Sequence, residues 1–203
     1  MNNIKLSIAL LLVAFSPAIA QQKSKLVPEN RTISALKEKA GVHLSAAEGS
    51  GIAWVKDVTF TNGTIEIDLR GKNVKQGSFI GVAFHGISKD DCEAVYFRPF
   101  NFVATDSLAS MHMVQYVQDT LYGWERLRDE HPGVYENKLA TPPDPNNWFH
   151  VKVVVEGTSI KAYVNNTLCL SVTSLNKKNT GKLGLWVGNG SDGDFANLKI
   201  KHN

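Results

Sequence analysis

A charged residue, Arg98, follows a strand-like run of apolar and aromatic residues at positions 92–97. Alternation along a strand puts Tyr96 and Arg98 on one face and Glu93 on the other. A buried core face does not normally carry a guanidinium beside a phenol, whereas a groove that holds a polar ligand does. The run therefore predicts a ligand-binding groove at the end of this strand.

Residues near this strand in sequence supply further polar and aromatic groups. Pro99 has no backbone N–H and suits a strand end, so Asn101 is expected in a loop at the mouth of the groove. In the strand expected over 78–85, alternation puts His85 on a face with small residues such as Gly81, where another group can approach closely. The predicted ligand-binding residues are His85, Tyr96, Arg98, Asn101, Gln115, Tyr116 and Trp124.

These residue types suit a carbohydrate. Planar polar side chains bond sugar hydroxyls in pairs, and aromatic faces cover the apolar side of a sugar ring. The first role falls to Arg98, Asn101 and Gln115, and the second to Tyr116, Trp124 and Trp186. The alternative is that Arg98 is tied to a loop carboxylate and that the tryptophans belong to the core.

Carboxylates are the other candidates for chemistry. Glycosidases use two carboxyl groups roughly 5–10 Å apart, one protonated and one ionised. Glu93 is the candidate catalytic acid or base, and Glu125 and Glu136 in the following loop are its candidate partners. Glu66 and Asp68 share a polar strand face, which is more typical of a solvated outer surface.

No motif predicts an organic cofactor: a serine-nucleophile motif, a phosphate-binding glycine loop and a dinucleotide fingerprint are all absent from the sequence. Calcium stays open, because the Asp and Asn residues in loops 90–91, 144–147 and 191–194 are both oxygen ligands and ordinary turn residues. No cysteine cluster indicates zinc. Cys92 and Cys169 either form a disulfide or are small buried hydrophobic residues.

The N-terminal residues are typical of a secretion signal. Lys5 precedes an apolar run over 6–15, and small residues precede Gln21. Neither this run nor any later one reaches the roughly 20 apolar residues that a membrane span requires. We expect a signal peptide over 1–20, an N-terminal arm over 21–41 and one domain over 42–203, secreted or periplasmic.

The formal net charge of the chain is +3, and removal of Lys5 lowers it by one. This charge is small, and the basic residues are scattered rather than grouped. The composition therefore predicts neither nucleic-acid binding nor membrane binding. It leaves the oligomeric state open.

Short strand-like segments separated by turn residues follow from residue 42 onward. Alternation is clearest over 64–70, where Ile65, Ile67 and Leu69 oppose polar residues. Further strands are expected over 52–56, 78–85, 112–118, 149–156, 159–164, 168–172, 183–187 and 195–201. Short helices are expected only over 33–39 and, within the long loop after residue 118, over 123–130. This spacing predicts an all-β fold, an antiparallel two-sheet jelly-roll sandwich.

The order of these segments resembles the concanavalin A-like lectin and glucanase superfamily. The resemblance rests on FTNGTIEID at 60–68, WFHVKV at 148–153, IKAYVN at 160–165, GKLGLWVG at 181–188 and DFANLKI at 194–200. Within the superfamily, the chain looks most like secreted bacterial domains of the 3-keto-disaccharide hydrolase group. The resemblance implies glycan binding or cleavage on the concave sheet. The Glu-x-Asp-x-Glu strand of laminarinase-type relatives does not occur, because Arg70 follows Glu66 and Asp68 in place of the second Glu. In the strand with Glu93, Val95 stands where the keto-disaccharide group tends to have Gln.

Three functions are therefore compared. The first is an exported carbohydrate-binding domain, and the second is a glycoside hydrolase or 3-keto-glycoside-cleaving enzyme that uses a glutamate as acid or base. The third is a structural envelope protein with no sugar site. A pocket with aromatic residues favours binding, two carboxylates in the pocket favour the enzyme, and a filled sheet face favours the structural role.

Overall fold

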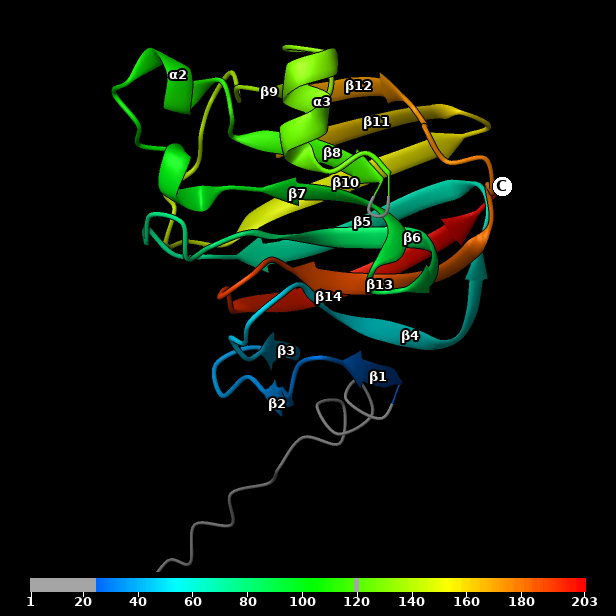
Figure 1. Ribbon diagram of the computed structural model, residues 1–203. Coiled ribbons are helices and arrows are strands. Elements are labelled where there is room, and N and C mark those ends of the chain that lie inside the picture. Colours follow the sequence, from blue (N-terminus) through cyan, green and yellow to red (C-terminus); the bar gives the residue numbers. More distant parts are fainter. Residues whose placement is uncertain (1–24, 119–120) are drawn as a thin grey trace, which may run out of the picture.

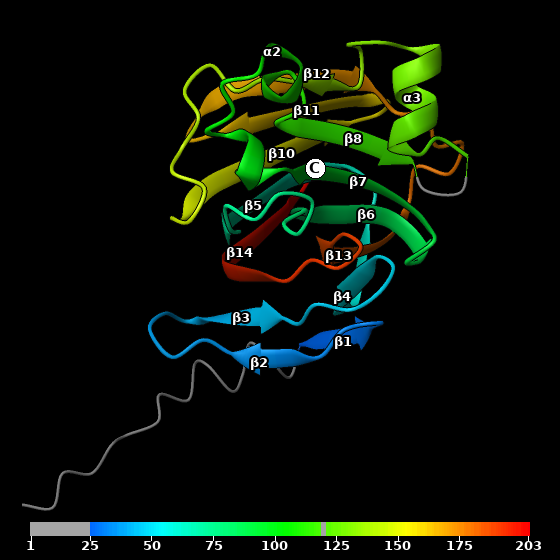
Figure 2. The same cartoon turned by 60° about the vertical axis from the view of Figure 1, so that its left-hand side comes forward.

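The computed structural model describes residues 25–118 and 121–203. These residues form two antiparallel β-sheets of seven strands each, which face each other as the layers of a sandwich (Figures 1 and 2). The predicted all-β jelly-roll sandwich is confirmed. The signal peptide expected over 1–20 lies outside the described residues.

The first sheet has the strand order β1-β4-β13-β6-β7-β8-β9. Its strands are β1 (Leu26–Glu29), β4 (Gly51–Phe60), β13 (Gly181–Val187), β6 (Ile80–Ser88), β7 (Asp91–Phe97), β8 (Val114–Gln118) and β9 (Glu136–Asn137). The late strand β13 lies between β4 and β6 (Figure 1). This insertion brings residues near 186 next to residues near 81 and 96.

The second sheet has the strand order β12-β11-β10-β5-β14-β3-β2. Its strands are β12 (Thr167–Thr173), β11 (Ser159–Val164), β10 (Phe149–Glu156), β5 (Gly63–Arg70), β14 (Gly193–His202), β3 (Gly41–Leu44) and β2 (Ile33–Ala35). The C-terminal strand β14 pairs with both β5 and β3.

The core lies between the two sheets, where alternate side chains of each strand meet. The aliphatic residues of β5 and β10 are buried and their polar neighbours are partly exposed, as the sequence predicts. Phe97 of β7 contacts Phe149 of β10 across the layers, with ring centroids 5.5 Å apart. Because side chains alternate along a strand, this contact puts Tyr96 on the outer face of the first sheet.

The helix expected over 33–39 is wrong. Ile33–Ala35 form β2, which pairs with β3 so that Ile33 lies opposite Leu44. An isolated helix of seven residues is marginal in water, whereas the open edge of β3 offers backbone hydrogen bonds at once. The segment predicted as an N-terminal arm thus adds one edge strand to each sheet.

The connections around β8 contain the helical elements η1 (Pro99–Asn101), α2 (Ser107–Ser110) and α3 (Trp124–Glu130). The helix expected over 123–130 is confirmed as α3, which lies beside β8 (Figure 2). Its Leu127 is buried in the core cluster and anchors it there. Among the described residues, no helix is long and apolar enough to cross a membrane.

Cys92 in β7 and Cys169 in β12 are buried, and no disulfide joins them. Burial raises the pKa of the Cys169 thiol to about 12. Of the two interpretations left open by the sequence, the structure therefore supports two small buried hydrophobic residues.

Candidate functional site

A pocket of about 650 Å³ opens on the outer face of the first sheet, where β7 ends. Strands β7 and β13, the loop before β6, and helices η1, α2 and α3 all contribute to its lining. The aromatic lining residues are Phe79, Tyr96, Phe100, Trp124 and Trp186, and the polar ones include Arg98, Asn101 and His112. Its size and its mixture of apolar walls with few polar groups are typical of a small-molecule site.

The floor of the pocket is a stacked aromatic pair. The rings of Tyr96 and Trp186 are 4.8 Å apart with an interplanar angle of 29°. Both residues flank Gly81 of β6, which is the register partner of each. A Cβ on Gly81 would lie 2.6 Å from Tyr96 Cα, so only glycine leaves this space clear. The small residue noted in the sequence therefore permits the approach of two aromatic rings.

Arg98 is buried beside this pair, with only 6% of its surface exposed. Its Nη2 donates to the Tyr96 hydroxyl at 2.8 Å and to Gln115 Oε1 at 3.2 Å, and its Nη1 donates to the His112 carbonyl at 3.2 Å. Gln115 is fully buried behind it and donates its own amide to two main-chain carbonyls. The structure thus brings Tyr96, Arg98 and Gln115 together, and Arg98 takes part in none of the ion pairs formed by described residues.

Asn101 lies in η1 at the same end of the pocket. Pro99 begins this short helix, consistent with its expected place after a strand end. The amide nitrogen of Asn101 donates to the His112 carbonyl at 3.0 Å, which fixes the side chain beside Arg98. Phe100 contacts Phe79 edge to face, with centroids 5.3 Å apart, and both rings line the wall.

His112, Glu136 and Arg128 form a charged cluster in the pocket wall. His112 Nδ1 lies 2.7 Å from Glu136 Oε2. Arg128 of α3 donates to both oxygens of Glu136, at 3.0 and 2.7 Å. Trp124 is 44% exposed at the rim, and its ring lies 4.9 Å from the Arg128 guanidinium carbon.

Burial and charge fix the protonation of this cluster. Burial lowers the pKa of His112 and outweighs the opposing effect of Glu136. Burial alone would raise the pKa of Glu136, but the hydrogen bonds from Arg128 hold it below its usual value. The Glu136 carboxylate lies 2.7 Å from Nδ1 without the alignment of a hydrogen bond, and its negative charge favours the tautomer with the proton on Nδ1, which leaves a lone pair on Nε2. No local pattern in the sequence links His112 to Glu136.

The structure does not bring His85 to this pocket. Its backbone is left-handed, with φ of +50°, and the β6–β7 register shifts between Phe84 and Ser88. This irregularity breaks the alternation that predicted a shared face with Gly81. The imidazole is instead fully buried and stacks on Phe60 at 5.9 Å.

Glu93 and Tyr116 belong to the same interior network as His85. Glu93 Oε2 lies 2.6 Å from His85 Nδ1, and its Oε1 accepts from the Tyr116 hydroxyl at 2.6 Å and the Ser174 hydroxyl at 2.5 Å. His85 Nε2 lies 2.8 Å from the carbonyl of Thr61. Glu93 is 0% exposed and faces away from Arg98, as alternation predicts, and the structure does not bring Glu93 or Tyr116 to the pocket.

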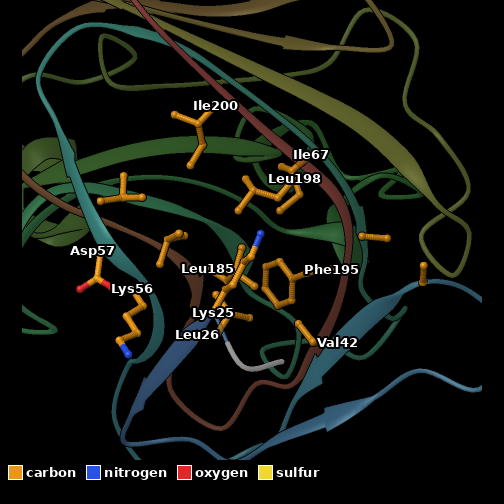
Figure 3. A pocket seen from close by; sticks show the side chains of 14 residues that line it. Lys25, Leu26, Val42, Lys56, Asp57, Ile67, Leu185, Phe195, Leu198 and Ile200 are labelled. Carbon is orange, nitrogen blue, oxygen red and sulfur yellow. The ribbon is translucent and has the colours of Figure 1, made fainter. Parts of the chain in front are cut away.

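A second cavity, of about 790 Å³, lies between the layers where β1 and β4 oppose β3 and β14. Its lining is mainly aliphatic: Ile67, Leu185, Leu198 and Ile200 lie around it with Phe195 (Figure 3). The charged lining residues are Lys25, Lys56 and Asp57. This cleft lacks the clustered planar polar groups that orient a sugar, so the pocket beside Arg98 is the better candidate.

In two of the three loops considered for calcium, the carboxylates have other partners. Asp194 accepts from Arg70 at 2.9 Å, and Asp192 is paired with Lys72. Asp144 accepts from the backbone of its own turn. Among the described residues, no three His, Cys, Asp or Glu side chains gather where they could hold a metal ion.

Residues 20–201 match the model of one protein family, described as the 3-keto-alpha-glucoside-1,2-lyase-like domain. The chain belongs to this family. The resemblance stated from the sequence is thereby confirmed. No curated protein matches the chain in sequence.

Solved structures with the same fold are distant in sequence. A carbohydrate-binding module, CBM66 from Bacillus subtilis, is 18% identical with a TM-score of 0.65, over 87% of this chain and 95% of that one. The exoplasmic/lumenal domain of VIP36, in a Ca²⁺- and Man3GlcNAc-bound form, is 13% identical with a TM-score of 0.59, over 89% and 86%. The beta-glucanase of Bacillus licheniformis is 16% identical with a TM-score of 0.53, over 84% and 82%. At these identities the likeness establishes the concanavalin A-like fold.

Proposed function

We propose that this protein is an exported carbohydrate-binding domain whose glycan binds in the pocket around Arg98, Tyr96 and Trp186. One observation carries the proposal: a stacked aromatic pair lies next to a buried guanidinium in an open pocket. The partly exposed rings of Phe79, Phe100 and Trp124 suit the apolar side of a sugar ring. The planar side chains of Arg98 and Asn101 suit its hydroxyls. An open pocket favours a ligand over the purely structural alternative.

The comparisons add support at the level of the fold. One similar structure is named as a carbohydrate-binding module, and another was solved with Man3GlcNAc bound. Both share the sandwich fold with this chain at low sequence identity, so the identity of the ligand has to be inferred from the residues of this pocket. The location expected from the resemblance, a concave sheet face, stays a prediction.

A glycan array with the purified protein tests this proposal. We then expect Trp124→Ala and Asn101→Ala to weaken binding of the glycan found, each by about 2- to 10-fold, because each removes one contact of modest strength. Trp148→Ala is the matched control, since this half-buried tryptophan directly precedes β10, contacts Arg70 of the second sheet and does not line the pocket. Unchanged affinity in both pocket variants would show that the site is elsewhere, and absence of any bound glycan would oppose the function.

A second candidate function, cleavage of 3-keto-glycosides by elimination, is favoured by the His112–Glu136 pair. The family description names a 1,2-lyase acting on 3-keto-glucosides. A neutral imidazole that is oriented by a carboxylate and carries a lone pair on Nε2 is a suitable general base. Nε2 makes no hydrogen bond to a described residue, and His112 lines the pocket beside Arg98.

The chemistry of such a reaction matches these side chains. A ketone at C3 acidifies the C2–H bond, so His112 would take that proton while Arg98 donates hydrogen bonds to the enolate oxygen. The electron pair then forms the C1=C2 bond as the C1–O1 bond breaks, and the leaving oxygen takes a proton from the imidazolium or from water. The products are an unsaturated 3-keto sugar and a free alcohol, with no net oxidation.

A chromogenic 4-nitrophenyl 3-keto-α-glucoside tests this alternative. Release of nitrophenol together with an ultraviolet-absorbing unsaturated ketone is expected, and His112→Gln should lower the rate by about 10²- to 10⁴-fold. His150→Gln is the control, because this histidine lies on β10 of the second sheet. Equal rates in His112→Gln and the unaltered protein, or release of nitrophenol without the unsaturated product, would exclude this mechanism.

A further inference from the structure

We propose that the ligand of the Arg98 pocket is an anionic saccharide, one whose carboxylate, as in a uronic acid, binds at Arg98. This inference rests on the proposed function, since it concerns the same pocket, and it adds the chemical class of the ligand. It follows from the charges in and behind the pocket and from the unused hydrogen-bond donors of Arg98.

Cationic groups outnumber carboxylates around the pocket. Lys75, Arg98 and Arg128 line it, and the lining contains one carboxylate, Asp106. Glu136 lies behind Arg128, where the two form a bidentate pair. The charge of Arg128 is therefore balanced by Glu136. The excess positive charge of the lining is that of Lys75 and Arg98.

A further buried cation lies next to the pocket. Arg31 is more than nine-tenths buried and donates to the carbonyls of Gly49 and Gly188, the second of which is a pocket-lining residue. Neither Arg31 nor Arg98 is paired with a carboxylate among the described residues. Burial of a charge without a countercharge is costly. One such guanidinium lines the pocket and the other contacts a lining residue, and together they raise the potential of the pocket for an anion.

Asp106 does not supply the missing countercharge. Its Oδ1 accepts from the backbone N–H of Ala109 at 2.7 Å and so caps the N-terminus of α2. Its interaction is therefore with the helix rather than with Arg98.

Arg98 also has donors to spare. A guanidinium carries five N–H groups, and Arg98 uses three of them, toward Tyr96, Gln115 and the His112 carbonyl. The other two have no acceptor among the described residues. These free groups are the N–H of Nε and one N–H of Nη1, which lie on different edges of the guanidinium. A carboxylate oxygen can accept from either one, and unlike a sugar hydroxyl it also brings the missing negative charge.

The aromatic floor fits the same ligand. Tyr96 contacts both Trp186 through its ring and Arg98 through its hydroxyl. The Arg98 guanidinium lies over the Tyr96 ring, with its carbon 4.9 Å from the ring centroid, and it lines the pocket, so a ligand in the pocket can place a carboxylate close to it. The lone pair that His112 carries on Nε2 provides an acceptor for a ring hydroxyl on the same ligand.

Matched ligands test the proposal. Methyl α-glucuronide, its methyl ester and methyl α-glucoside differ in charge but keep the same ring, and longer glucuronic- and galacturonic-acid oligomers can be compared with their neutral homologues. Affinity is measured by titration calorimetry, and binding at the pocket is located by shifts of tryptophan indole N–H signals in NMR spectra. We expect the acid to bind about tenfold more tightly than its ester. The preference should shrink in 1 M salt, where the screening length falls to about 3 Å.

Two variants locate the charge effect. Lys75→Ala removes an exposed lining cation and should reduce the preference for the acid, whereas Lys177→Ala, an exposed lysine outside the pocket lining, should not. Arg98→Lys keeps the charge but loses the planar fork, so it should weaken acid binding more than ester binding. A circular dichroism spectrum confirms that each variant is folded.

The outcomes separate this inference from the function beneath it. If the ester, the neutral sugar and the acid bind equally, with the same indole shifts, the pocket binds glycans and the anionic preference is wrong. If neutral glycans alone bind, the inference is likewise overturned. If no saccharide of either kind shifts the indole signals, the proposed function fails and the inference fails with it.

Discussion

Replacement of Glu93 separates a structural carboxylate from a catalytic one. Glu93 is buried in the interior and its two oxygens receive three polar partners: His85, Tyr116 and Ser174. In Glu93→Gln, the amide oxygen can still accept from both hydroxyls and the amide nitrogen can donate to His85 Nδ1. One extra amide N–H then lacks a partner, so we expect a loss of about 1–2 kcal/mol in unfolding free energy.

Glu93→Leu has a much larger expected effect. It leaves two hydroxyl donors and one imidazole nitrogen without a partner in a closed interior, and each such group costs about 1–3 kcal/mol. The sum is about 3–9 kcal/mol, a large part of the total stability of a typical domain. At about 2–4 °C per kcal/mol for a chain of this size, Tm should fall by roughly 6–36 °C, against a few degrees for Glu93→Gln.

The assay combines thermal unfolding with the ligand-binding and 3-keto-glycoside assays. Glu156→Gln is the control, an exposed glutamate at the end of β10 whose substitution should leave Tm unchanged. Glu93→Gln should keep its binding affinity and any elimination rate, because Glu93 faces away from the pocket. A rate that falls a hundredfold or more while Tm barely changes would refute this reasoning and restore Glu93 as the catalytic acid or base.

Three further predictions follow from single contacts. The pKa of His112 is lowered in the folded protein, so as pH falls below about 6.5 its imidazole is protonated first in the unfolded chain, and the folded protein loses stability. His112→Gln should therefore flatten the loss of unfolding free energy between pH 7 and 5 in denaturant titrations. An equally steep loss in the variant would contradict this. A thiol reagent should label Cys92 and Cys169 only after unfolding, since both are buried; rapid labelling of native protein would show that one is accessible. Gly81→Ala should lower the unfolding free energy by about 2–4 kcal/mol, because the new Cβ meets backbone atoms of β7. Gly123→Ala is the control, since the space around its Cβ is open. Similar Tm values for the two variants would argue against the packing described.

The sequence predicts the fold well because its alternation is local and mostly uninterrupted. Buried and partly exposed residues alternate along the whole length of β5 and β10, so the sequence predicts which face of each strand is buried. The helix expected near residue 33 fails for the opposite reason. Its three strand residues are held by pairing with β3, a contact that the local sequence does not encode.

The candidate site is only partly predictable. Tyr96 and Gln115 lie on regular, adjacent strands, so alternation puts them on one face, and the structure brings them together with Arg98. Alternation also predicts that His85 lies on this face. His85 itself has a left-handed backbone and lies at a register shift, so its side chain points to the other face. A non-glycine residue rarely adopts this backbone, and nothing in the residue order near position 85 announces it.

The His112–Glu136 pair lies beyond local patterns altogether, because its partners come from separate connections on either side of α3. What joins them is the pairing of β8 with β9, in which Gln115 lies opposite Glu136. This register puts Glu136 on the outer face with Gln115, while Glu93 lies on the inner face of the neighbouring strand. The two glutamates considered as a catalytic pair are therefore on opposite sides of one sheet. The histidine–carboxylate pair in the pocket wall is His112 with Glu136, and the interior network around Glu93 can change without altering the groups that line the pocket.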